Sequence, residues 1–132
     1  MNSRIMVDTS VWIDFFRGKL IRETQLLDNL IIENCVLLCP VIIQEILQGI
    51  VTDNDYDKVK NLITGFEIIS ADPVLAAIGA AEIYRQLKKK GETIRKLNDC
   101  LIAWYCIHFD FPVLHKDRDF DIMEQHTSLV VV

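Results

Sequence analysis

The chain has 132 residues, which is enough for one domain with a hydrophobic core of its own. Its hydrophobic content of 51% excludes a disordered protein, and its net charge of −5 is not typical of a nucleic-acid-binding protein. No apolar stretch approaches the ~20 residues that a membrane-spanning helix needs. Residues 1–4 do not resemble a signal peptide, so we expect a cytoplasmic protein.

Short apolar runs alternate with amphipathic stretches along the chain. In order, we predict a strand over residues 4–7, helices over 9–16 and 19–34, a strand over 35–39, helices over 40–49 and 53–64, a strand over 67–70, helices over 73–90 and 97–109, and strands over 112–115 and 128–132. Thr9 and Ser10 provide an N-cap for the first helix, and Gly18 ends it. Pro40 and Pro73 suit the first position of their helices.

The predicted strands are apolar throughout, whereas strands with one solvent-facing side alternate in polarity. This pattern is typical of a parallel sheet that is covered by helices on both faces. We therefore expect an α/β fold with a central parallel sheet of about four to five short strands. The whole chain, residues 1–132, is predicted to form this single domain.

Five acidic residues interrupt or follow apolar runs, where a hydrophobic core disfavours charge: Asp8, Glu45, Asp99, Asp117 and Asp119. A carboxylate beside a core is costly unless a cation pairs with it. The carboxyl ends of parallel strands lie along one edge of a sheet. Asp8 directly follows a predicted strand, Asp117 lies just beyond the end of another, and Glu45 lies early in the helix after a third. We therefore expect the acids to meet in one cleft.

Clustered carboxylates have a chemical use. Mg²⁺ and Mn²⁺ prefer oxygen ligands, and a cation is needed to offset the repulsion between the acids. Bound ions of this kind activate water and stabilise the leaving oxygen during cleavage of a phosphodiester. Within this chain, the three histidines, His108, His115 and His126, share no spacing that indicates a catalytic constellation. We found no phosphate-binding glycine loop or dinucleotide fingerprint in the sequence.

Each acid also has a structural interpretation. Asp8 is a suitable cap for the helix that follows it, and Asp99 is suited to stabilise a helix N-terminus. Asp117 and Asp119 are typical of a turn before a short helix. Glu45 is harder to explain in this way because it lies within a helix among aliphatic residues. Because the acids come from four segments expected at one edge, we favour the functional interpretation.

Cysteines and basic residues give weaker signals. The four cysteines, Cys35, Cys39, Cys100 and Cys106, lack zinc-ligand spacing and lie among aliphatic residues, so we interpret them as buried small hydrophobes.

Basic residues cluster at 88–90, at 95–96 and at Lys116 and Arg118. The first cluster suits both a helix C-terminus and contact with phosphates. Arg118 has two open roles, which are pairing with a neighbouring acid and binding a substrate phosphate.

Four segments of the sequence resemble the signature motifs of PIN-domain proteins. They are VDTSVWID at 7–14, QEILQG at 44–49, NDCLIA at 98–103 and LHKDRDF at 114–120. Their order and spacing cover essentially the whole chain, and its size resembles a VapC-type toxin of a toxin–antitoxin pair. The resemblance implies a Mg²⁺- or Mn²⁺-dependent endoribonuclease that forms a homodimer. It also implies inhibition by a VapB-type antitoxin whose C-terminal segment enters the acidic cleft.

The resemblance also implies roles for individual residues. Carried over by position, Asp8, Glu45, Asp99 and Asp117 are the catalytic, metal-binding acids, and Asp119 is an auxiliary metal-binding acid. Thr9 or Ser10 is expected to hydrogen-bond a metal-bound water or a carboxylate. The implied substrate is RNA, with transfer RNA and ribosomal RNA both open.

Two other functions fit the same motifs. One is an RNA-processing nuclease that is not toxic, and the other is a catalytically silent module that binds RNA or protein. The complete set of acids argues against the silent module, which has no need for mutually repelling carboxylates. A phosphatase of the haloacid-dehalogenase type is excluded because it needs a second aspartate at the position of Ser10.

Overall fold

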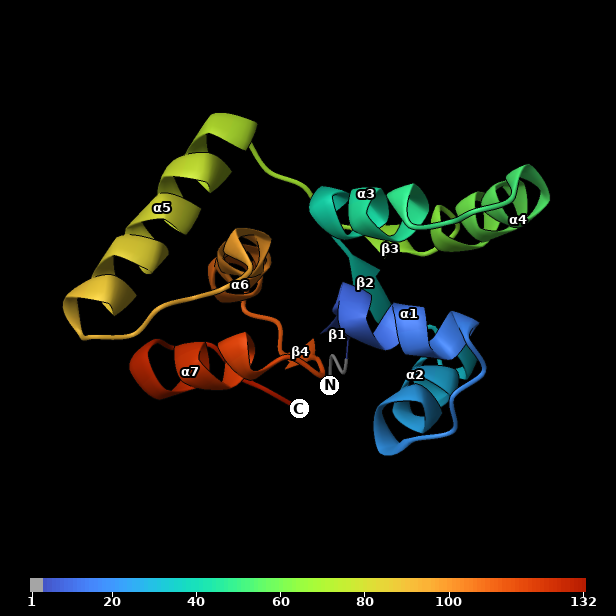
Figure 1. Ribbon diagram of the computed structural model, residues 1–132, viewed down its shortest axis with the longest axis horizontal. Coiled ribbons are helices and arrows are strands. Elements are labelled where there is room, and N and C mark those ends of the chain that lie inside the picture. Colours follow the sequence, from blue (N-terminus) through green and yellow to red (C-terminus); the bar gives the residue numbers. More distant parts are fainter. Residues whose placement is uncertain (1–3) are drawn as a thin grey trace.

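The computed structural model describes residues 4–132, so the expectation drawn from residues 1–4 lies outside the described part for all but residue 4. Over residues 4–132 the chain forms four strands and seven helices in alternation (Figure 1). The strands are β1 (Ile5–Val7), β2 (Val36–Leu38), β3 (Glu67–Ile68) and β4 (Val113–Leu114). The helices are α1 (Thr9–Phe16), α2 (Arg22–Ile32), α3 (Pro40–Gln48), α4 (Asp53–Ile63), α5 (Pro73–Lys89), α6 (Leu97–Phe109) and α7 (Arg118–His126).

The strands form one parallel sheet in the order β3-β2-β1-β4, which confirms the predicted α/β fold. Strand β1 is central, and Met6 pairs with Leu37 of β2 on one side and with Val113 of β4 on the other. The chain therefore runs outward from β1 to β3 and then returns to add β4 at the opposite side of β1. Reversals of this kind open a crevice at the carboxyl ends of the strands, where α/β proteins bind ligands.

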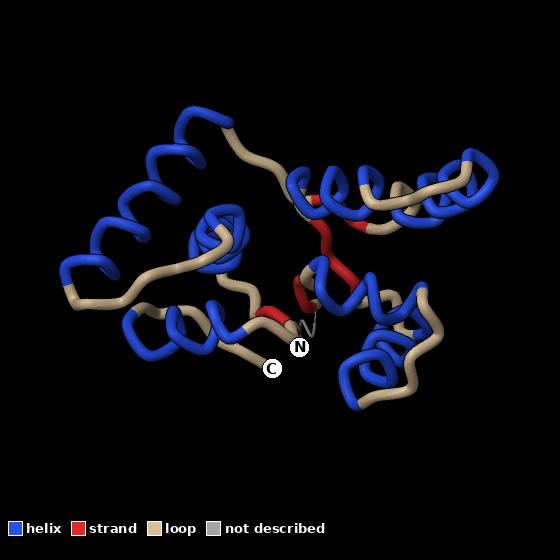
Figure 2. The backbone as a smooth tube through the Cα atoms, in the orientation of Figure 1, coloured by secondary structure: helices blue, strands red, loops and turns tan. Residues whose placement is uncertain are grey.

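Helices surround the strands, which lie near the middle of the molecule in Figure 2. Helix α5 packs on α6, and α1 packs on both α2 and α3. The residues of β2 are all buried, as are Met6 and Val7 of β1. A sheet that buries both faces of its central strands explains why these strands are apolar throughout. No helix within residues 4–132 is long and apolar enough to cross a membrane.

Two local predictions differ from the structure. The expected strand over 128–132 is wrong, because this segment forms only an isolated parallel bridge between Val113 and Val131. Of the two residues of β4, only Val113 is bridged to this segment. Helix α7 had no predicted bounds, although a short helix after Asp117 was one interpretation of the acids there. Predictions for Cys39, Cys100 and Cys106 as buried side chains are confirmed, and Cys35 is half-buried.

Candidate metal centre

Asp8 lies at the carboxyl end of the central strand, at the reversal between β1 and β4. Its backbone N–H donates to the carbonyl of Leu114 at 2.9 Å, which continues the pairing of the two strands. Its side chain caps α1 by accepting the backbone N–H of Ser10 at 3.0 Å, and it also accepts the Ser10 hydroxyl. The residue is 3% exposed. Asp8 therefore caps α1 and also lies at the crevice. The two roles are compatible because both hydrogen bonds from Ser10 use the same carboxylate oxygen, Oδ2.

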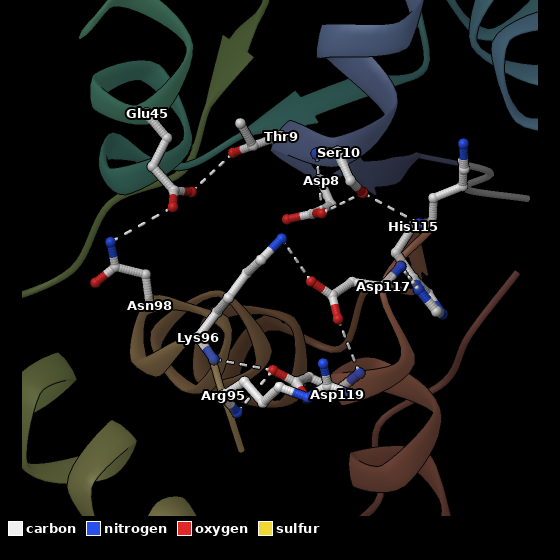
Figure 3. A network of polar contacts seen from close by, with 11 residues as sticks. Asp8, Thr9, Ser10, Glu45, Arg95, Lys96, Asn98, His115, Asp117 and Asp119 are labelled. Atoms are coloured by element: carbon white, nitrogen blue, oxygen red, sulfur yellow. Dashed lines mark hydrogen bonds and ion pairs between the residues drawn. The ribbon is translucent and has the colours of Figure 1, made fainter. Parts of the chain in front are cut away.

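Ser10 joins Asp8 to the segment that follows β4. While its hydroxyl donates to Asp8, its Oγ accepts the backbone N–H of Lys116 at 3.1 Å. The Lys116 ammonium donates to Asp14 of α1 at 2.7 Å, and Asp14 also pairs with Lys19 at 3.3 Å. These contacts hold the start of α1 against the segment that carries Asp117, and Figure 3 shows those made by Ser10.

Asp117 caps α7, and each atom of its carboxylate has a partner. Oδ1 accepts the backbone N–H of Asp119 at 3.1 Å, and Oδ2 lies 2.8 Å from the ammonium of Lys96. Its own backbone N–H donates to Nδ1 of His115 at 2.9 Å. Asp117 is therefore held in place from three directions.

Asp119 is buried, and only one of its two carboxylate oxygens accepts hydrogen bonds. Oδ2 accepts two backbone N–H groups, from Arg95 at 3.1 Å and from Lys96 at 3.0 Å, and so anchors the segment before α6. Oδ1 of Asp119 and Oδ2 of Asp99 are buried without a hydrogen-bond partner. Oxygen atoms of Asp99, Asp117 and Asp119 lie within 4.8 Å of one another.

Glu45 approaches the same region from α3. Its Oε1 accepts the Thr9 hydroxyl at 2.8 Å, and its Oε2 lies 3.5 Å from the side-chain nitrogen of Asn98. A pocket of about 200 Å³ connects these groups. Its lining residues are Asp8, Thr9, Ser10, Ile13, Glu45, Gln48, Lys96 and Asp99. Four segments of the chain thus bring the acids to one side of the sheet.

Burial dominates the electrostatics of these acids. It raises the pKa of Asp99 to about 9, with further contributions from the charges of Asp8, Asp117 and Asp119. Burial also raises the pKa of Asp8, although its hydrogen bonds with Ser10 oppose the change. For Asp117 burial acts in the same direction, but the ion pair with Lys96 and the Asp119 N–H outweigh it and lower the pKa. The ionised forms of Asp8 and Asp99 are therefore only partly compensated by their neighbours.

The acid cluster is consistent with a metal site. A buried carboxyl oxygen without a hydrogen-bond donor makes ionisation of the group costly, and the cluster has one such oxygen on Asp99 and one on Asp119. Hard divalent cations bind oxygen ligands and would supply the missing charge. The unpartnered oxygens, the short separation of the three acids and the adjoining pocket therefore fit a cation of this class.

The structure brings together all five acids that the sequence singled out, in two overlapping groups. Asp8, Glu45 and Asp99 line the pocket, and Asp117 and Asp119 join Asp99 in the cluster. Sequence reasoning missed two neighbours, Lys96 and Asn98. In the sequence, Lys96 belongs to the basic cluster at 95–96 and Asn98 to the motif at 98–103, and their proximity to Asp99 is a further signal that places them near the acids.

Comparison with known proteins assigns the fold to a family. Residues 5–125 match the PIN domain. The chain belongs to the PIN-domain family. Within it, this PIN domain is of the VapC type: Ribonuclease VapC11 of Mycobacterium tuberculosis is 34% identical over 127 residues, which cover 95% of each chain. Ribonuclease VapC1 of Methanocaldococcus jannaschii is 33% identical over 117 residues, or 88% of this chain and 77% of the relative.

Solved structures support the same architecture. The PIN domain superposes on a chain of VapBC2 from Rickettsia felis, a complex bound to a DNA fragment from its promoter, with a TM-score of 0.76. The match covers 97% of this chain and 96% of the other, at 17% sequence identity. At this identity the likeness extends to the fold.

Proposed function

We propose that the protein is a Mg²⁺- or Mn²⁺-dependent endoribonuclease and the toxin of a VapBC-type pair. The observation that supports it most is the unpartnered buried carboxylate oxygen of Asp99, set among further acids at the crevice between β1 and β4. Relatives that match nearly the whole chain are named ribonucleases. The expected place of action is the cytoplasm, where the RNA is.

The proposed roles follow the motif positions of the PIN domain. Asp8, Glu45, Asp99 and Asp117 hold the cation, and Asp119 contributes its unpartnered Oδ1 while its Oδ2 anchors the segment before α6. The cation, when bound, lowers the pKa of a water and offsets charge on the phosphate. Thr9 holds the Glu45 carboxylate at the pocket, and Ser10 orients that of Asp8.

Substrate binding is expected to involve the exposed Arg118. Within residues 4–132 it forms no ion pair with Asp117 or Asp119, and of its two open roles we favour binding of a substrate phosphate. The RNA itself is proposed to be transfer RNA or ribosomal RNA.

Cleavage of total cellular RNA tests the activity directly. Purified protein, freed of any antitoxin, is incubated with Mg²⁺ or Mn²⁺ and with EDTA, beside Asp8→Asn. We expect discrete, metal-dependent fragments that disappear in the variant, and mapping of their ends identifies the target. Asp110→Asn is the matched control, because Asp110 is exposed at the end of α6 in a left-handed conformation that asparagine tolerates. Cleavage that survives in Asp8→Asn would contradict the proposal.

Growth measurements separate the toxin from an RNA-processing nuclease that is not toxic. Induced expression of the toxin is expected to arrest growth, and co-expression of its antitoxin is expected to restore it. A nuclease that cleaves RNA in vitro and leaves growth unchanged would favour the processing role. A protein that binds RNA without metal-dependent cleavage would favour the silent module.

The proposed binding site for the antitoxin is a second, more apolar pocket of about 590 Å³ between α1, α3 and α4. Ile13 and Phe16 line it from α1, and it reaches Glu45, which also borders the acidic pocket. An amphipathic segment that binds there would extend toward the acids. Phe16→Ala is expected to weaken antitoxin binding in a pull-down. Phe15→Ala is the control, since Phe15 contacts the same Trp12 ring outside this pocket.

The proposed homodimer uses the outer face of α5. Val74, Leu75 and Ile78 are exposed there, and apolar side chains grouped on one helix indicate a protein contact. Ile78→Glu is expected to convert a dimer to a monomer in light scattering after size exclusion. Ile32→Glu, at an exposed isoleucine of α2, is the control. A dimer that persists in Ile78→Glu would place the contact elsewhere.

A further inference from the structure

The side chain of Lys96 reaches into the acid cluster from the start of α6. Its Nζ lies 2.8 Å from Oδ2 of Asp117. Figure 3 shows the ammonium directed toward the space between Asp117 and Asp8. The charges of Asp99 and Asp8 also act on this ammonium. A cation that belongs to the chain itself therefore lies among carboxylates suited to a divalent ion.

The backbone of Lys96 is fixed, whereas its side chain is not enclosed. The backbone N–H donates to Asp119 Oδ2 at 3.0 Å, beside the N–H of Arg95 on the same oxygen. The side chain is 64% exposed, and it borders the pocket of about 200 Å³ together with Asp8 and Asp99. The ammonium is thus able to move into solvent by rotation of the side chain alone.

We propose that Lys96 is a tethered counter-ion that neutralises the acid cluster in the metal-free protein and withdraws when a divalent cation binds. This inference rests on the proposed function, because it takes the cluster to be the metal site. The ammonium and a divalent cation repel each other and attract the same carboxylates. Lys96 therefore lowers the affinity for the cation while it stabilises the metal-free fold.

Replacing the ammonium by an apolar group of similar length tests this exchange. Lys96→Met is compared with wild type in two measurements: the Kd for Mn²⁺, from the free ion in electron paramagnetic resonance, and the thermal unfolding midpoint in EDTA. We expect Lys96→Met to bind Mn²⁺ at least about threefold more tightly and to unfold at a lower temperature in EDTA. Lys96→Arg keeps the charge and is expected to remain close to wild type in both.

Lys89→Met controls for the change in net charge. Lys89 is exposed in the last turn of α5 and does not line the acidic pocket, so its replacement is expected to leave Mn²⁺ affinity unchanged. If Lys96→Met is too unstable to study in EDTA, Lys96→Gln provides the same comparison. Mn²⁺ binding to Lys96→Met that is equal to or weaker than in wild type would overturn the inference.

The same titration distinguishes this inference from the proposed function. If wild type does not bind Mn²⁺, or if Asp99→Asn does not remove the binding, the proposed metal centre is wrong. The counter-ion role of Lys96 is then overturned with it. If wild type binds Mn²⁺ and Asp99→Asn abolishes that binding, the metal centre stands. Unchanged affinity in Lys96→Met would then overturn the role of Lys96 alone.

Discussion

His115 accepts the backbone N–H of Asp117 through Nδ1 at 2.9 Å, while its Nε2 lies 3.2 Å from Oδ1 of Asp121. A neutral imidazole with its proton on Nε2 satisfies both contacts, since Nδ1 is then an acceptor and Nε2 a donor. The ring is buried and packs near Phe120. His115 therefore orients the segment that carries Asp117 without itself facing the acid cluster.

Replacing His115 by leucine is expected to disturb Asp117. Loss of the acceptor leaves the Asp117 N–H without its partner, which costs about 1–2 kcal/mol in the free energy of unfolding. We expect urea denaturation to report this loss and RNA cleavage to fall with it. His115→Asn is the matched variant, because an asparagine oxygen accepts the N–H two residues ahead. Equal losses in both variants would mean that packing of the ring, and not the hydrogen bond, positions Asp117.

Asp99→Asn is expected to separate activity from stability. The amide removes a ligand charge with little change of shape, so cleavage should fall by at least about 100-fold. In EDTA at neutral pH, the melting temperature should equal or exceed that of wild type, because a buried acid near other carboxylates is removed. A large drop in the melting temperature would instead identify Asp99 as a structural residue.

Metal-free stability is expected to decrease as pH rises. Burial raises the pKa of folded Asp99 to about 9, whereas in the unfolded chain it is close to 3.9. Between these values the native state binds more protons than the unfolded state, so the free energy of unfolding falls with increasing pH. Asp8, whose pKa burial also raises, acts in the same direction.

Denaturation in EDTA at several pH values between about 5 and 9 measures this slope. The slope should be shallower in Asp99→Asn, which lacks the titrating group. Saturating Mg²⁺ should weaken or reverse it, since the cation binds the ionised carboxylates and releases their protons. A metal-free stability that rises through this range would contradict the assignment of Asp99 as a buried, uncompensated acid.

The position of the acids could be predicted because it depends on topology. Asp8 and Asp117 each follow a buried apolar run, and parallel strands place such residues at a common edge. Lys96 could not be placed in the same way. Its contact with Asp117 spans two segments far apart in the sequence, and it depends on Asp119 anchoring the backbone before α6. Side-chain contacts across loops have no periodic signal in a sequence.

The errors in secondary structure have a similar origin. The segment at 128–132 is apolar and β-branched, which is typical of a strand, yet only Val131 bridges to β4. Whether such a segment forms a strand depends on its tertiary pairing, which its composition does not specify. Helix α7 is short and rich in charged residues, and its clearest signal in the sequence is the capping residue Asp117. That residue is equally well interpreted as a metal ligand, so it did not define a helix by itself.

Gly79 permits the close packing of α5 on α6. A Cβ atom at this position would lie 2.1 Å from Nε1 of Trp104 and 2.2 Å from its Cδ1. The indole has little freedom to move away, because it stacks on His108 with ring centroids 4.5 Å apart. Gly79→Ala should therefore reduce the free energy of unfolding by about 1–3 kcal/mol, as measured by urea denaturation.

Two further variants make this prediction specific. Gly49→Ala is the control, since a Cβ there meets nothing closer than 3.6 Å, and its stability should remain close to wild type. Trp104→Phe in the Gly79→Ala background should recover part of the loss, because the smaller ring relieves the clash, and a double-mutant cycle measures the coupling. Additive effects of the two substitutions would contradict a direct contact. Coupled effects would establish that position 79 and Trp104 are in direct contact where α5 packs on α6.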